Sequence, residues 1–125
     1  MKELNVLYVD DDMINRKLLE NILNKSPFIS KTYEAKDGME ALQILQENPD
    51  INFVLLDVLM PNLDGITTLQ FMKNDKRLAR IPVIVLSTDD TQKVRAIEAG
   101  ANDFINKPVK KEELLEKIEK YSSVL

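Results

Sequence analysis

Four short segments of the chain carry polar side chains that could do chemistry, and each follows a run of apolar residues. They are Asp10-Asp11-Asp12, Asp57, Ser87-Thr88 and Lys107-Pro108. Carboxylates, hydroxyls and amines are the groups that hold hard divalent cations and phosphoryl oxygens. Phosphoryl transfer relies on such a set, because it requires an oxygen nucleophile, a metal ion and a nearby positive charge.

The 125-residue chain contains no histidine, no cysteine and no tryptophan. This composition excludes Ser-His-Asp and Cys-His nucleophiles, Cys/His zinc sites and disulfide frameworks. The net charge of -4, from 17 basic and 21 acidic residues, argues against a surface for nucleic-acid phosphates. Neither a secretory leader nor an apolar run of membrane-spanning length is present, so we expect a cytoplasmic protein that contacts no membrane.

Apolar runs alternate with segments of helical period along the chain, a pattern typical of a parallel sheet covered by helices. We expect strands at residues 4–9, 32–35, 53–56, 83–86 and 103–106. Helices are expected at residues 13–25, 39–47, after Gly65, 91–99 with Gly100 as the C-cap, and 110–122. The predicted fold is one α/β domain over residues 1–125: a doubly wound, five-stranded parallel sheet with five helices and the flavodoxin-like strand order 2-1-3-4-5.

Ligands of such sheets bind at the carboxyl ends of the strands, where all four polar segments lie. The predicted order makes the first and third strands neighbours, so Asp10, Asp11 and Asp57 should come together. Three close carboxylates repel one another unless they take up protons or bind a cation, and oxygen ligands favour Mg²⁺. From spacing alone they could equally be solvated charges, whereas Asp12 is expected to cap the following helix.

The chain resembles the response regulator receiver domain of two-component signalling. The resemblance is carried by Val-Asp-Asp at 9–11, Leu-Leu-Asp-Val-Leu-Met-Pro-Asn-Leu-Asp-Gly at 55–65, Val-Leu-Ser-Thr at 85–88 and Gly-Ala-Asn-Asp-Phe-Ile-Asn-Lys-Pro at 100–108. Ala-Lys-Asp-Gly-Met-Glu-Ala-Leu at 35–42 is similar to the second strand and helix of that family. The joint spacing of these motifs is specific, and it covers essentially the whole chain.

The resemblance implies a role for each polar residue at the strand ends. Asp57 would accept a phosphoryl group from a histidine kinase or a histidine phosphotransfer protein. Lys107 would pair with the phosphoryl oxygens, and its bond to Pro108 would be cis. The Mg²⁺ site would be formed by Asp11, Asp57 and the backbone carbonyl of Leu59, with Asp10 supporting the ion through water.

The resemblance also implies a switch that presents the fourth helix, fifth strand and fifth helix to a downstream protein. Ser87 would move to hydrogen-bond the phosphoryl group, and Phe104 would rotate inward into the vacated space. Thr88 would contact the phosphoryl group and crowd its pocket, because the family usually has Ala or Gly there. Ser87 replaces the commoner Thr and Phe104 the frequent Tyr. The expected oligomeric state is a monomer or a weak phosphorylation-dependent dimer.

Four other interpretations share parts of this pattern. A receiver excised from a hybrid kinase or a multidomain regulator would carry the same residues. A haloacid-dehalogenase-like phosphohydrolase needs an Asp two residues after its nucleophile, where this chain has Leu59. A flavin-binding flavodoxin-like module needs a Ser/Thr/Gly-rich loop in place of Asp10-Asp11-Asp12. A degenerate receiver used only for docking would not need the site groups that this chain retains. We therefore expect no enzymatic turnover beyond phosphorylation and dephosphorylation of the chain itself.

Overall fold

The computed structural model describes residues 3–122, which form five parallel strands, five α-helices and one short 3-10 helix. In chain order the elements are β1 Leu4–Val9, α1 Met13–Asn24, β2 Ile29–Ala35, α2 Gly38–Glu47, β3 Phe53–Asp57, α3 Gly65–Lys73, η1 Leu78–Arg80, β4 Val83–Ser87, α4 Gln92–Glu98, β5 Asp103–Asn106 and α5 Lys111–Ser122. The strand order is β2-β1-β3-β4-β5, which confirms the predicted fold. No helix among the described residues is long and apolar enough to cross a membrane.

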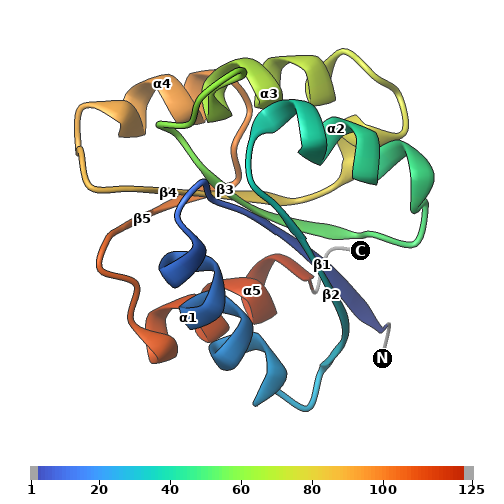
Figure 1. Ribbon diagram of the computed structural model, residues 1–125, viewed down its shortest axis with the longest axis vertical. Coiled ribbons are helices and arrows are strands. Elements are labelled where there is room, and N and C mark those ends of the chain that lie inside the picture. The colour runs from blue at the N-terminus through green and yellow to red at the C-terminus, as the bar shows by residue number, and fades with distance from the viewer. Residues whose placement is uncertain (1–2, 123–125) are drawn as a thin grey trace.

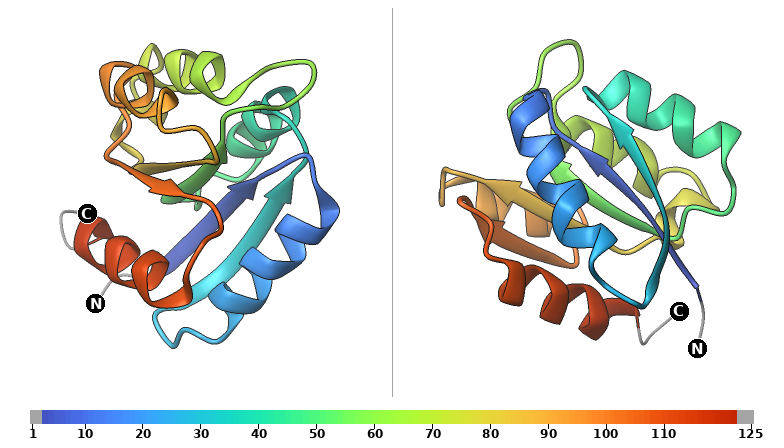
Figure 2. Two further views of the ribbon diagram at one scale, coloured as in Figure 1. Left: turned by 90° about the vertical axis from the view of Figure 1, so that its left-hand side faces the viewer. Right: turned by 60° about the horizontal axis from the view of Figure 1, so that its bottom comes forward.

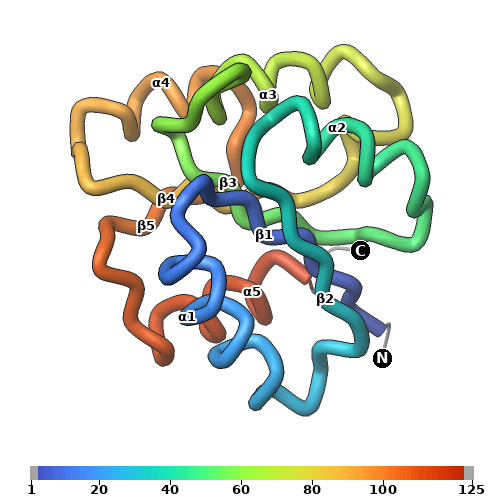
Figure 3. The backbone as a smooth tube through the Cα atoms, viewed as in Figure 1, coloured from blue at the N-terminus to red at the C-terminus, as the bar shows by residue number. Residues whose placement is uncertain are grey.

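The sheet lies between two layers of helices, with α1 and α5 on one face and α2, α3 and α4 on the other (Figures 1, 2 and 3). Each central strand is buried on both faces, because alternate side chains point to opposite sides of a strand. In β3, Phe53 and Leu55 pack with residues of α1 and α5, whereas Val54 and Leu56 pack with residues of α2 and α3. The sheet is therefore a rigid support for the loops at its edge.

Three helices begin at the carboxyl edge of the sheet with an aspartate as the N-cap. Asp12 accepts a hydrogen bond from the Ile14 amide, Asp37 from the Glu40 amide and Asp64 from the Thr67 amide. The predicted cap at Asp12 is confirmed. Each cap therefore fixes where the chain enters its helix at this edge of the sheet.

The loop after β3 closes tightly over the end of that strand. The amide of Gly65 donates to the carbonyl of Val58 over 2.8 Å. A Cβ atom on Gly65 would overlap the carbonyl oxygen of Asp57. The loop can approach β3 this closely only because residue 65 has no side chain.

Several element boundaries differ from the sequence-based expectations. Strand β2 begins at Ile29 rather than at residue 32, because this edge strand pairs only with β1 and its early residues are half-buried or exposed, which weakens the apolar pattern. The 3-10 helix η1 was not expected; Asp75 accepts hydrogen bonds from the amides of Arg77 and Leu78 and starts this turn.

The fourth helix ends one residue earlier than expected. The C-cap of α4 is Ala99, and Gly100 follows it with a φ of 109°, the left-handed conformation that glycine adopts at helix ends. These differences lie at element ends and leave the topology unchanged.

Candidate functional site

Asp10 lies at the carboxyl end of β1, where it is 1% exposed. Its Oδ1 accepts a hydrogen bond from the Asp12 amide at 2.9 Å, and its Oδ2 lies 2.8 Å from Nζ of Lys107. Arg16 donates from Nη1 to the Asp10 backbone carbonyl at 2.9 Å. A buried carboxylate is stable only when its oxygens are partnered, and these contacts fix the orientation of Asp10.

Asp57 is the last residue of β3 and is 6% exposed. Its Oδ1 accepts a hydrogen bond from the Val58 amide at 3.0 Å and lies 3.2 Å from Nζ of Lys107. Lys107 therefore bridges two carboxylates, one directly after β1 and one at the end of β3. Because β1 and β3 are neighbours in the sheet, the predicted meeting of Asp10 and Asp57 is observed.

The charges at this edge shift one another's protonation. Burial raises the pKa of Asp57 from 3.8 to about 6; the charge of Lys107 opposes this shift and the charge of Asp10 adds to it. Burial alone would lower the pKa of Lys107, but its hydrogen bond to Asp10 and the charge of Asp57 raise it. Lys107 is thus held as a cation, while the Asp57 carboxylate is destabilised relative to an exposed one.

Three carboxylates are grouped closely enough to share one metal ion. Asp10, Asp11 and Asp57 can each offer an oxygen within 4.8 Å of the others, and Asp11 is the exposed member. Among the ion pairs of residues 3–122, the side chains of Asp10 and Asp57 pair with Lys107, so the three carboxylates outnumber the cation that pairs with them. Carboxylate oxygens with this excess suit a hard divalent cation, and the donor set fits the Mg²⁺ expected from the sequence.

Leu59 lies beyond β3, in the loop that follows Asp57, and its side chain is 63% exposed. Ser87 ends β4 and is 2% exposed; its Oγ accepts a hydrogen bond from the Asp89 amide at 3.1 Å. The next residue, Thr88, is exposed at the same edge. The carbonyl of Ser87 accepts the Lys107 amide at 2.9 Å, which joins the ends of β4 and β5, and the Lys107-Pro108 bond is cis.

Phe104 lies in β5 opposite Val85 of β4 and is 6% exposed. It belongs to the apolar cluster on the α2, α3 and α4 side of the sheet. The resemblance implied a ring that turns inward; in this structure the ring already occupies a buried position. Phe104 therefore lies in the apolar core, beside Val85 and not beside the polar residue Ser87 that ends β4.

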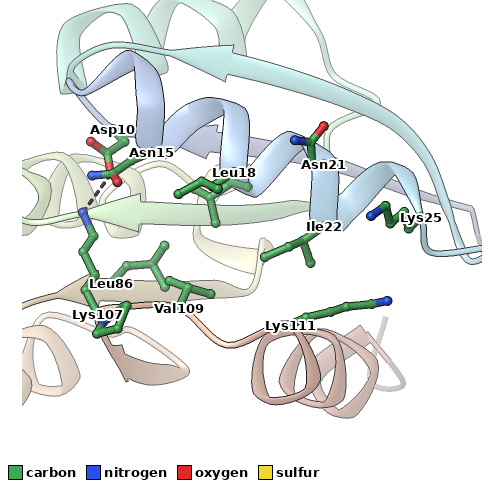
Figure 4. A pocket seen from close by; sticks show the side chains of 12 residues that line it. Asp10, Asn15, Leu18, Asn21, Ile22, Lys25, Leu86, Lys107, Val109 and Lys111 are labelled. Carbon is green, nitrogen blue, oxygen red and sulfur yellow. Dashed lines mark hydrogen bonds and ion pairs between the residues drawn. The ribbon is translucent and has the colours of Figure 1, made fainter.

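A groove of about 370 Å³ runs from Asp10 and Lys107 along α1 to Lys25 and Lys111 (Figure 4). Its apolar lining is formed by Leu18, Leu19, Ile22, Leu86, Pro108 and Val109. The sequence analysis did not identify this groove, because its walls come from α1, β4 and the segment after β5. The available signal was an excess of apolar residues in α1, among them Leu18, which lines the groove and is 56% exposed.

Comparisons with known proteins agree with this geometry. A family model described as the response regulator receiver domain matches residues 6–119. Chemotaxis protein CheY-3 of Vibrio cholerae is 34% identical over 121 residues, which cover 95% of this chain and 92% of that protein. A protein-glutamate methylesterase/protein-glutamine glutaminase of Nitratidesulfovibrio vulgaris is 39% identical over 110 residues, 86% of this chain but only 29% of that protein.

Solved structures give the same result. The CheX-CheY-BeF3-Mg²⁺ complex from Borrelia burgdorferi contains a chain that matches with a TM-score of 0.83 and 33% identity, covering 94% of this chain and 88% of that one. Similar sequences thus occur both in proteins of about this length and as parts of longer proteins.

Proposed function

Because the chain belongs to the response regulator receiver domain family of two-component signalling, we propose that Asp57 accepts a phosphoryl group from a histidine of a partner protein. The observation that carries this proposal is the position of Asp57, a buried carboxylate at a strand end, 3.2 Å from Nζ of Lys107. The donor would be a histidine kinase or a histidine phosphotransfer protein, since this chain has no histidine of its own.

The proposed reaction exchanges one bond to phosphorus for another. An oxygen of the Asp57 carboxylate attacks phosphorus, the new O–P bond forms as the N–P bond to the partner's histidine breaks, and the released imidazole takes up a proton from solvent. Oδ1 is engaged by the Val58 amide and Lys107, which favours Oδ2 as the attacking atom. Lys107 then neutralises charge on the phosphoryl oxygens.

We propose that Mg²⁺ is held by Asp10, Asp11, Asp57 and the backbone carbonyl of Leu59. When bound, it would offset negative charge on the phosphoryl oxygens. The excess of carboxylate charge over Lys107 supports this assignment, as does the Mg²⁺ present in the related complex from Borrelia burgdorferi. Asp10, already held by Asp12 and Lys107, is the least free of these ligands to move.

The proposed switch runs from Ser87 to the surface of α4, β5 and α5. The Ser87 hydroxyl can donate its hydrogen to a phosphoryl group on Asp57, with Thr88 beside it at the edge. The buried position of Phe104 favours a role in holding the phosphorylated arrangement over a large rotation of its ring. The output would be a contact between this surface and a downstream protein. Residues 1–125 would act as a single cytoplasmic receiver domain.

The apolar groove between α1 and the segment after β5 supports the partner assignment. It ends at Asp10 and Lys107, so a partner surface seated there would bring its histidine next to Asp57. A phosphohydrolase function is disfavoured by Leu59, because no second carboxylate occupies that position to act as acid or base.

Incubation with acetyl phosphate and Mg²⁺, followed by peptide mapping of the acid-labile phosphoryl group, tests the proposal. We expect the label on Asp57, none in Asp57→Asn, and normal labelling in Asp90→Asn, which changes an exposed aspartate outside the cluster. Persistent labelling of Asp57→Asn would contradict the assignment. Steady turnover of phosphate esters would favour the hydrolase instead.

A further inference from the structure

A buried carboxylate joins two loops at the carboxyl edge of the sheet, the turn between β2 and α2 and the loop between β3 and α3. Asp37 is 5% exposed. Its Oδ1 accepts the Glu40 amide at 2.8 Å, and its Oδ2 accepts Nδ2 of Asn62 at 2.8 Å. One oxygen therefore caps α2 while the other holds the neighbouring loop.

The backbone makes a second connection beside this one. The Gly38 amide donates to the carbonyl of Leu63 at 3.1 Å. Asn62 has a φ of 69°, in the left-handed region that asparagine adopts more readily than most residues. A Cβ atom on Gly38 would overlap the hydroxyl of Thr68 in α3 and lie 2.7 Å from the carbonyl oxygen of Leu63, so the start of α2 packs against this loop and α3 without space for a side chain.

The loop held in this way is the one that carries Leu59. It leaves β3 at Asp57 and is closed at its far end by the bond from the Gly65 amide to Val58. The Leu59 side chain is 63% exposed, so its own packing contributes little to the position of its backbone. The connections at residues 62 and 63 tie the middle of this loop to the neighbouring turn, in addition to the packing of Met60 against the apolar core.

We propose that Asp37 and Asn62 are positioning residues for divalent cation binding, because their hydrogen bond holds the loop that presents the Leu59 carbonyl. The proposal rests on the proposed function, which assigns that carbonyl to the cation. The hydrogen bonds from Glu40 and Asn62 also lower the pKa of Asp37, which keeps its carboxylate charged and able to accept both.

The first test follows amide hydrogen exchange in the metal-free protein. In Asn62→Gly, which keeps the left-handed backbone accessible but removes the amide, exchange at Gly38 and Gly65 should become about fivefold or more faster. Exchange at Glu40 should be unchanged in this variant, because its bond to Asp37 remains. Unchanged exchange at both glycines would overturn the positioning role.

The second test measures Mg²⁺ affinity by titration calorimetry. Asn62→Gly and Asp37→Asn should each weaken binding by roughly threefold to tenfold, the loss expected for one hydrogen bond that acts through a ligand. The exchanged pair Asp37→Asn with Asn62→Asp can re-form the bond with donor and acceptor reversed, and it should recover most of the affinity. Tyr33→Phe is the matched control, since it removes a 2.7 Å side-chain hydrogen bond to Asp50 outside this loop.

Equal Mg²⁺ affinity in the wild type and both single variants would overturn the proposal, as would an equal loss in Tyr33→Phe. If the wild type binds no Mg²⁺ in millimolar solution, the proposed metal site and the cation part of this inference both fail. The exchange data then decide separately whether Asp37 and Asn62 hold the loop.

Discussion

At the scale of single residues, Asp57 combines two opposing demands. Its proposed chemistry needs a charged carboxylate, but burial and the neighbouring Asp10 destabilise that charge. The Val58 amide and Lys107 offset only part of the free-energy cost of burying this charge, so the pKa of Asp57 is raised to about 6. At neutral pH the group is mostly ionised, at the expense of the stability of the folded chain.

We therefore predict that Asp57→Asn stabilises the protein at pH 7. The pKa of Asp57 is higher in the folded state than in the unfolded state, so its favourable contribution is complete below pH 3.8 and is lost as the pH rises through about 6. The variant should gain roughly 1–3 kcal/mol at pH 7 and little at pH 3.5. Urea unfolding at both pH values measures this, and an equal gain at both would contradict the assigned cause.

A second prediction concerns Lys107. Replacing it with Met removes the cation that opposes the effect of burial, so the pKa of Asp57 should rise above about 6. Carboxyl ¹³C chemical shifts followed through a pH titration give this value directly. Lys110→Met, which changes an exposed lysine nearby, should leave the Asp57 titration unchanged.

The sequence was informative about which polar residues meet, and less so about what they contact. Asp10 and Asp57 come together because they end strands whose order could be predicted. The contact of Arg16 with the Asp10 carbonyl was not predicted, because no local pattern encodes where a long side chain turns back. The same holds for the hydrogen bond between Asp37 and Asn62, which links residues that read separately as turn formers.

At the scale of elements, central strands were better predicted than edges and caps. The strand β3 is apolar along its whole length because both of its faces are covered, whereas β2 carries exposed side chains that hide its true start at Ile29. The turn η1 follows hydrogen bonds from the amides of Arg77 and Leu78 to the Asp75 side chain, and a polar side chain contributes no hydrophobic periodicity. Predictions from apolar spacing therefore fail where hydrogen bonds decide the structure.

The last helix is anchored by Asp103, and this contact yields an element-scale prediction. Its Oδ2 accepts hydrogen bonds from Lys117 and Tyr121, both at 2.8 Å. Burial tends to raise the pKa of Asp103, but these bonds and the Phe104 amide lower it below 3.8. Its contribution is thus present above pH 3.8 and is lost as the pH falls through the folded-state value.

Asp103→Asn should accordingly cost roughly 1–2 kcal/mol at pH 7, and the difference from wild type should shrink in acid. Thermal unfolding at pH 7 and pH 3 measures both values, and faster amide exchange in α5 would locate the effect. Asp90→Asn is the control for loss of one negative charge at an exposed position. A loss of equal size at both pH values would count against the ionic anchor.

At the scale of the whole molecule, the alternation of strand and helix segments was enough to predict the doubly wound topology. Strands β1, β3, β4 and β5 each place residues in both apolar clusters, and β2 places Ala35 in one cluster and Ile29 against the other. The sheet and its two helix layers therefore form one cooperative unit. Binding at one edge should therefore stabilise the entire structure rather than a local part of it.

This predicts that Mg²⁺ raises the Tm of the wild type. The added free energy of unfolding should grow with the logarithm of the Mg²⁺ concentration above the dissociation constant. It should reach about 2.7 kcal/mol when the concentration is a hundred times that constant. Asp11→Asn should leave the Tm of the metal-free protein unchanged, because Asp11 is the exposed member of the carboxylate cluster. It should lose most of the stabilisation by Mg²⁺, because Asp11 is a proposed ligand of the ion. A Tm that responds equally in both proteins would indicate general salt effects.

The ion pair between Asp10 and Lys107 also bears on how the protein is made. Its two residues are 97 positions apart, and they directly follow the first and last strands of the chain. A ribosome synthesises Asp10 early and Lys107 only after β1 to β5 have been translated. The aspartates therefore exist in the nascent chain long before their cation does, and the proposed acceptor site is complete only on a chain whose synthesis has passed β5.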